Sequence, residues 1–226
     1  MIKKYQSKYK QLGIKMRIKL PFTILLLFLT NFSFGQTSKI LTKQETENLK
    51  TDIDNISFPV YRAYKYNDKN GYYNLLLCEN QQTINKKDTL NSKIEAVCYL
   101  EDHGGYIKKW TIFDQIETSK TEAEDNENTI YFWTKYCSVS DIDKDNEIDP
   151  IIVYGTKTEY GFRRIKIFTL YKGKKYVIRA VENTLDYGRT FKKDDSFKQL
   201  PIKIRQYIDK LMDKMRAEQD ILLKNG

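Results

Sequence analysis

Residues 93–113 read KIEAVCYLEDHGGYIKKWTIF and carry the plainest structural signal in the chain. Apolar, aromatic and β-branched side chains predominate over 93–101 and recur over 106–113, which is typical of strands. The intervening Asp-His-Gly-Gly, residues 102–105, has the composition of a tight turn. The segment therefore predicts a β-hairpin.

The same pattern recurs along the chain. Strand-like segments rich in aromatic and β-branched residues come in pairs, and each pair is separated by residues that favour turns. Polar segments at 79–92 and 114–128 read as solvated loops between these pairs. The further predicted hairpins pair 58–66 with 72–78 around 67–71, 129–139 with 150–154 around an acidic segment, and 162–171 with 175–181 around 172–174.

A helix is expected from Pro201, because proline favours the first helical position. One apolar stripe at helical spacing follows it, formed by Ile204, Ile208, Leu211, Met215 and Leu222. We therefore expect an α+β fold, an antiparallel sheet of about eight strands in consecutive hairpins with a C-terminal amphipathic helix packed on it. Residues 36–57 are expected to form a polar lead-in or short helix, and 58–224 a single strand-rich domain.

The N-terminal segment 1–35 has the composition of a secretory signal peptide. A basic stretch precedes an apolar run of about ten residues, which is too short to span a bilayer as a helix. Small residues at Ser33 and Gly35 suit cleavage after Gly35, and Met16 is a possible true start. We expect an exported protein, periplasmic or extracellular, with no transmembrane segment in the mature chain; an uncleaved anchor is the alternative.

The net charge of +9 comes mainly from this N-terminal segment. Residues 1–35 contain seven lysines and arginines and no acid, which leaves 32 basic and 30 acidic residues in the rest. A nucleic-acid-binding protein needs a basic face on its folded domain. The sequence therefore predicts no nucleic-acid partner.

Three cysteines follow the signal segment: Cys78, Cys98 and Cys137. Exported proteins can form disulfides, so a Cys78–Cys98 bridge and three buried thiols are both open. Only one histidine, His103, is present, and no C-x-x-C motif, which argues against a zinc site. His103 lies in a turn and has no recognisable nucleophile motif to serve.

The candidate metal site is the segment 141–149, DIDKDNEID, in which four aspartates occupy positions 1, 3, 5 and 9 of a calcium-loop spacing. Two carboxylates about 4 Å apart repel by roughly 4 kcal/mol at an effective dielectric of about 20, and a hard dication removes that repulsion. The predicted calcium ligands are the side chains of Asp141, Asp143, Asp145 and Asp149 and the backbone carbonyl of Glu147.

Two features distinguish this loop from an EF-hand. Position 12 is Ile152 instead of a bidentate glutamate, and a strand follows instead of a helix. Asn146 occupies the sharp-turn position, where glycine is usual, and Ile148 can anchor the loop in the core. We expect weak calcium binding, on the order of 10⁻⁴ to 10⁻³ M; a solvated acidic turn without metal is the alternative.

Several segments together resemble a small family of exported bacterial proteins labelled as surface polysaccharide biosynthesis proteins. The family pattern has glycine where this chain has Asn146. The resemblance implies an envelope role with a surface glycan or an envelope protein as partner, and it brings no catalytic residues. The segments that carry it are YNDKNG (66–71), LEDHGGYIKKW (100–110), FWTKY (132–136), DPIIVYGT (149–156) and YKGKK (171–175).

We therefore expect a calcium-stabilised, exported protein without catalytic activity. Two alternatives stay open. One is an enzyme that acts on surface polysaccharide through a pair of acidic residues, as glycoside hydrolases do. The other is a metal-free secreted domain that binds other proteins.

Overall fold

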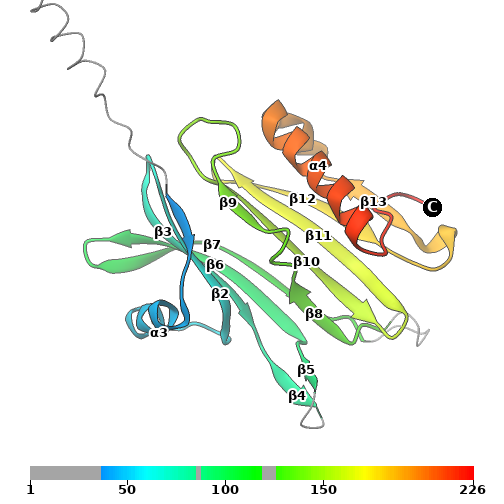
Figure 1. The fold of residues 1–226 in the computed structure, drawn as a ribbon, viewed down its shortest axis with the longest axis horizontal. Helices are drawn as coiled ribbons and strands as arrows, with labels where there is room; N and C mark the ends of the chain where they lie inside the picture. Colours follow the sequence, from blue (N-terminus) through cyan, green and yellow to red (C-terminus); the bar gives the residue numbers. More distant parts are fainter. Residues whose placement is uncertain (1–36, 85–87, 119–125) are drawn as a thin grey trace, which may run out of the picture. The chain divides into compact units, whose positions relative to one another are not determined.

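The computed structural model describes residues 37–84, 88–118 and 126–226 (Figure 1). Its strands pair antiparallel throughout, and its two longer helices lie near the two ends of the described chain, so the predicted α+β class is confirmed. The predicted signal segment lies outside the described residues. No helix among the described residues has the length and apolar character needed to cross a membrane.

Two main sheets and one short ribbon contain all the described strands. The first sheet has the order β1-β2-β3-β6-β7, and the second has the order β13-β12-β11-β10-β8, with β9 paired to β10. Their bounds are β1 Ser38–Ile40, β2 Val60–Asp68, β3 Gly71–Glu79, β6 Lys93–Asp102, β7 Gly105–Gln115, β8 Thr129–Phe132, β9 Ser138–Ser140, β10 Asp149–Thr158, β11 Gly161–Tyr171, β12 Lys174–Val181 and β13 Thr190–Lys193; the ribbon is β4 Gln82–Ile84 with β5 Asp88–Leu90.

The helices cover the outer faces of these two sheets (Figure 1). Helix α3 (Lys43–Asp52) begins with a capping box in which Thr42 and Glu45 exchange hydrogen bonds, and it packs Leu49 on the first sheet. Helix α4 (Ile202–Glu218) packs on the second sheet. Two short 3₁₀ helices, η2 (Asp186–Gly188) and η3 (Asp195–Gln199), precede α4.

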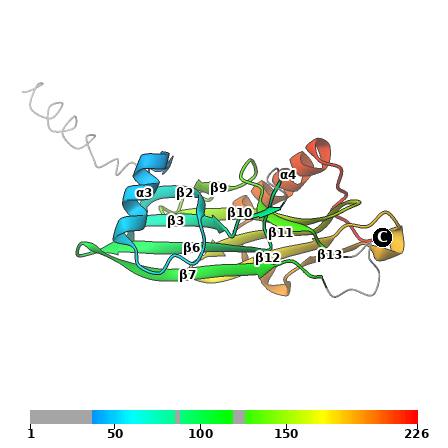
Figure 2. The ribbon, with the colours of Figure 1, turned by 90° about the horizontal axis from the view of Figure 1, so that it is seen from below.

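The two sheets pack face to face, which differs from the single sheet that was expected. A shared core cluster draws residues from both sheets, among them Leu75, Leu77, Ile152 and Phe168. The long strands of both sheets run in similar directions in Figure 2, as in an aligned β-sandwich. The chain thus forms four layers, in the order helix, sheet, sheet, helix.

Continuous apolar runs in the central strands explain this arrangement. Residues 75–77 of β3 and 151–153 of β10 are all apolar, and every one of them is at most 1 % exposed. Such runs indicate strands that are covered on both faces, whereas a strand covered on one face alternates. Each sheet therefore has a helix on one side and the other sheet on the opposite side.

Helix α4 follows the predicted stripe with one exception. Ile204, Ile208, Leu211 and Met215 are buried against the second sheet. The helix ends at Glu218, however, so Leu222 lies in the C-terminal tail and is 40 % exposed. Leu222 was wrongly placed in the stripe; Ile221 and Leu223 of the tail are the residues buried in this core.

All three cysteines are free thiols. Cys78 packs in the core between the first sheet and α3, whereas Cys98 packs between the two sheets, where its sulfur lies 3.3 Å from the hydroxyl of Tyr66. The two thiols point to opposite faces of one sheet, so the Cys78–Cys98 bridge does not form. Burial raises the pKa of both thiols to about 12.

Candidate metal centre

The acidic loop connects β9 to β10 in the second sheet and has an unusual backbone. Lys144 and Asn146 both have left-handed conformations, with φ of 71° and 69°. This conformation is unfavourable for most residues, but asparagine tolerates it better than most. The predicted sharp turn at Asn146 is therefore present.

Three of the predicted ligands converge. Asp141, Asp143 and Asp149 each offer one carboxylate oxygen, and these oxygens lie within 4.8 Å of one another. Calcium binds oxygen at about 2.3–2.6 Å, so two oxygens on one ion can be no more than about 5 Å apart. The three oxygens therefore satisfy the distance limit for a shared calcium ion.

Backbone amides hold Asp141 in place. Its Oδ1 accepts hydrogen bonds from the amides of Lys144 (2.7 Å) and Asp145 (3.2 Å), and its Oδ2 accepts one from Asn146 (3.2 Å). Asp141 is only 6 % exposed. An ionised carboxylate has about four acceptor sites, so these bonds fix its orientation and leave capacity for a metal.

The carboxylates of Asp149 and Asp145 each lack part of the stabilisation that a buried charge needs. Asp149 is 1 % exposed, and burial, together with the nearby carboxylates of Asp143 and Asp145, raises its pKa to about 7. Asp145 accepts the amide of Glu147 at Oδ1 (2.9 Å), but its Oδ2 is buried without a hydrogen-bond partner. A dication beside Asp149 would lower that pKa. Asp145, also a predicted ligand, is not among the three carboxylates that converge.

Lysines from two other parts of the fold bind this loop. Lys69, in the β2–β3 turn, donates to the carbonyl oxygen of Asp145 (3.1 Å) and pairs with the Glu147 side chain (3.0 Å). Lys203, in the first turn of α4, donates to the carbonyl oxygen of Asp143 (2.7 Å). The side chain of Glu147 is therefore engaged by Lys69. That its backbone carbonyl binds calcium stays a prediction.

Two apolar residues anchor the loop in separate cores. Ile142 packs against the core between the second sheet and α4. Ile148 packs against the core between the sheets, as the sequence predicted. The acidic residues between them are thus held at a fixed place in the fold.

Sequence reasoning missed a buried ion-pair network between the sheets. Glu127, whose side chain is 2 % exposed, accepts hydrogen bonds from Nε (2.6 Å) and Nη2 (2.7 Å) of Arg164 in β11. Arg164 also contacts Asp114 in β7 at 3.3 Å, and Asp114 binds Lys166 at 2.6 Å. Burial disfavours the charged form of the Arg164 guanidinium. Its acidic partners outweigh this effect and hold the pKa of Arg164 above the usual value.

Both polar segments expected to be solvated loops contain buried acids at their ends. Residues 114 and 115 belong to β7, and Glu127 is buried; the stretch 119–125 lies outside the described residues. At the start of the other segment, Glu79 is 4 % exposed and accepts the Phe132 amide of β8 (3.0 Å) and the Asn91 side chain (2.8 Å). Burial raises the pKa of Glu79. No periodicity signals such acids, because they pair with groups far away in sequence.

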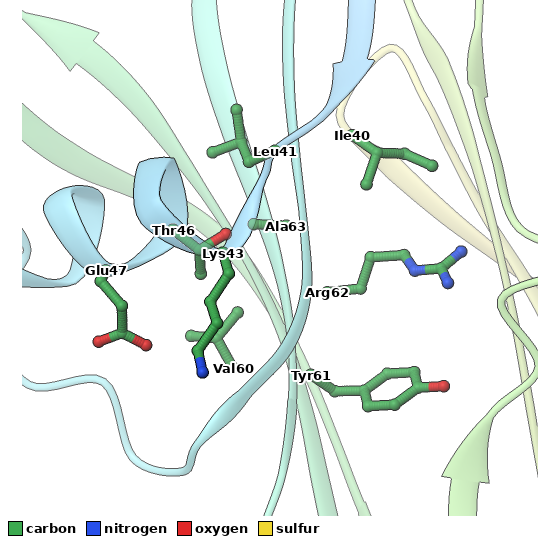
Figure 3. Close-up of a pocket in the computed structure, with 9 residues that line it drawn as sticks. All are labelled: Ile40, Leu41, Lys43, Thr46, Glu47, Val60, Tyr61, Arg62 and Ala63. Atoms are coloured by element: carbon green, nitrogen blue, oxygen red, sulfur yellow. The ribbon is translucent and has the colours of Figure 1, made fainter.

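A shallow pocket of about 360 Å³ lies beside the edge of β2 (Figure 3). It forms where the chain leaves β1 to enter α3, because β1 pairs only with residues 64–66 of β2. Exposed Ile40 and Tyr61 line it, together with Arg62 and a single acid, Glu47. The pocket therefore offers no acid pair for glycoside chemistry.

His103 has a local role. It adopts a left-handed conformation (φ 47°) in the β6–β7 turn, and its side chain is 93 % exposed. Its Nδ1 lies 2.7 Å from a carboxylate oxygen of the neighbouring Asp102. This is the local turn contact expected of a histidine without a catalytic partner.

Comparisons of the chain with protein-family models, with curated proteins and with solved structures found no match.

Proposed function

We propose that this chain is an exported, calcium-stabilised protein of the envelope or extracellular space and has no catalytic activity. The observation that carries the proposal is the convergence of Asp141, Asp143 and Asp149 within 4.8 Å. The raised pKa of the buried Asp149 carboxyl supports it, because a dication beside this group would stabilise its charged form.

Export and weak calcium binding support each other physically. Outside the cell, calcium at about 1 mM and a Kd of about 0.1 mM would stabilise the folded state by about 1.4 kcal/mol. The same affinity gives no occupancy at cytosolic calcium concentrations. The N-terminal segment supplies the argument for export, through its basic start, short apolar run and small residues.

The partner that we propose is a surface glycan or another envelope protein. This rests on the resemblance of segments such as 100–110 and 149–156 to exported proteins with a polysaccharide label. The nearly balanced charge after residue 35 gives no support to a nucleic-acid partner.

A metal-free interaction domain is the second candidate, and one observation favours it. Lys69 and Lys203 already place two cations on the loop, and Lys172 contributes a favourable charge near Asp145 and Glu147. These lysines offset part of the carboxylate repulsion without a metal.

Thermal unfolding in calcium and in chelator tests the proposal. At about 1 mM calcium the parent should melt about 3–6 °C higher than in chelator, which is the linkage energy converted for a domain of this size. Asp143→Ala should abolish the difference, whereas the matched control Asp213→Ala, in the exposed Asp213–Arg216 pair of α4, should keep it. Coincident melting curves for the parent would refute the metal site. A glycan array with and without calcium then tests the partner.

A further inference from the structure

Side chains cap several edges of the two main sheets. On the outer edge of β7, Lys175 and Arg164 donate to two backbone carbonyls (2.9 and 2.6 Å). Glu79 accepts an outer amide of β8 (3.0 Å), and the Asn225 side chain accepts an outer amide of β13 (2.7 Å). Free amides and carbonyls on an edge strand can pair with another chain. These contacts therefore protect three of the edges from such pairing.

One stretch of β2 has no such cover. On the side of β2 away from β3, β1 pairs with residues 64–66 only. The Leu41 amide donates to the Ala63 carbonyl (2.9 Å), and Thr42 then caps α3, so the chain leaves the edge at this point. Within the described ranges, no strand pairs with residues 60–63 on this side. The stretch is therefore open to an added strand.

The pocket of about 360 Å³ adjoins this open stretch (Figure 3). Ile40 and Tyr61 line it and are 57 % and 48 % exposed, so they offer uncovered apolar surface. A β-bulge between Val60 and Arg62 shifts the register with β3, and the consecutive side chains of Tyr61 and Arg62 lie on the same side of β2 in Figure 3. An added strand would therefore meet an aromatic ring, a guanidinium group and a hollow for a side chain.

The charge of the pocket favours an acidic occupant. Among the described residues that line it, Lys43 and Arg62 are cations and Glu47 is the single acid. Lys50 binds the Glu47 carboxylate (2.9 Å), which leaves positive charge in excess. A second copy of this chain would bring the same two cations against these ones, so charge disfavours self-association at this edge. An acidic, extended segment of another protein fits both the edge and the charge.

We propose that residues 60–63 of β2 and the adjoining pocket bind a partner protein by strand addition. The partner supplies a short extended segment with an acidic side chain for Lys43 or Arg62 and an apolar side chain for the pocket. In this binding mode main-chain hydrogen bonds provide affinity, and the side chains beside the edge provide specificity. The inference goes beyond the proposed function, because it selects a protein as the partner and does not depend on calcium.

Selection of phage-displayed random dodecapeptides on the full chain tests this proposal. The enriched peptides should share acidic and apolar residues in an alternating pattern. For a synthetic copy of one enriched peptide, Lys43→Glu and Tyr61→Ser should each weaken binding by about threefold to tenfold, because the first reverses a charge and the second removes an aromatic contact. Lys210→Glu and Tyr160→Ser, at exposed positions elsewhere, are the matched controls and should bind as the parent.

The variants at the pocket should fold. Lys43 is exposed and is the first residue of α3, where an acidic residue is favourable because of the helix dipole. Tyr61 is half exposed, so its replacement leaves no cavity in a core. Equal melting temperatures of variants and parent check this.

Strand addition also predicts a result specific to the backbone. Alternate amides of a bound strand point towards β2, and the others point away from it. N-methylation of alternate residues of the peptide in one phase should therefore weaken binding by about tenfold, whereas methylation in the other phase should weaken it by less than about threefold.

Three results would overturn the proposal. The first is that no peptide binds the parent above background, or that affinity is unchanged in both pocket variants. The second is an equal effect of the two methylation phases, which would exclude pairing with the edge. The third is a glycan on an array, or a dimer in sedimentation, whose binding Lys43→Glu removes; the pocket would then belong to a glycan or to a second copy. Each of these results would leave the metal site standing, because none depends on calcium.

Discussion

Replacing Glu127 by glutamine should test how much the buried ion pair between the sheets contributes to stability. The Glu127 carboxylate accepts four hydrogen bonds: two from Arg164, one from the hydroxyl of Thr156 (2.6 Å) and one from the amide of Glu117 (2.7 Å). Each oxygen accepts two of them. A glutamine amide would present NH₂ in place of one oxygen, so two donors would lose their acceptor in either orientation.

The expected loss is about 3–5 kcal/mol, the usual result of removing one partner of a buried ion pair. Screening reduces it little, because the side chains of Arg164 and Glu127 are 15 % and 2 % exposed. For a domain of this size, a loss of about 3 kcal/mol corresponds to a melting temperature about 6–12 °C lower.

Urea unfolding at fixed calcium concentration measures this effect. The matched control is Asp209→Asn, which breaks the more exposed Lys193–Asp209 pair (2.8 Å) and should lower the free energy of unfolding by less than about 1 kcal/mol. A Glu127→Gln variant that loses no more than this control would refute the reasoning. It would show that the buried pair contributes no more than a surface pair.

Two further predictions concern pH and the C-terminal helix. In chelator, the raised pKa of Asp149 favours its neutral form in the folded state, so its contribution to stability is present below about pH 4 and is lost as the pH rises through about 7. The difference in unfolding free energy between Asp149→Asn and the parent should therefore grow over this range in chelator and shrink when calcium is added; a difference independent of pH would contradict the assignment. Met215→Ala should lower the free energy of unfolding by about 2–5 kcal/mol because Met215 is fully buried, whereas Leu222→Ala should lower it by less than about 1 kcal/mol. Equal losses in urea unfolding would show that Leu222 packs as part of the helix.

The local elements could be predicted from the sequence because their signals are local. The turn at 102–105, the strand-like composition on either side of it and the apolar spacing from Ile204 to Met215 each depend on neighbouring residues. The division into two sheets was missed. Its signal was present in the all-apolar runs 75–77 and 151–153, which indicate strands covered on both faces.

The turn between β2 and β3 could be located from the sequence only approximately. The Asn-Gly dipeptide at 70–71, within the predicted turn 67–71, has the composition of the centre of a tight hairpin, yet Gly71 pairs with Asp68, and Lys69 and Asn70 lie between them. Gly71 alone has a positive φ, 141°. The dipeptide therefore predicts the position of the turn but not which residues close it.

The candidate metal site was predicted in part. Aspartate spacing brought Asp141, Asp143 and Asp149 together as expected, since all three lie within one short loop. The contacts with Lys69 and Lys203 could not be predicted, because they join segments about 60 to 80 residues apart in sequence. The buried acids Glu79 and Glu127 were missed for the same reason.

Because Cys78 and Cys98 lie on opposite faces of one sheet, the reactivity of each thiol reports on the opening of a different interface. Neither sulfur can meet a thiol reagent until its layer opens, since both residues are 0 % exposed. Labelling at Cys78 would time the release of α3, and labelling at Cys98 would time the separation of the sheets. Mass spectrometry of the two labelled peptides would then show which interface opens first when the protein is destabilised.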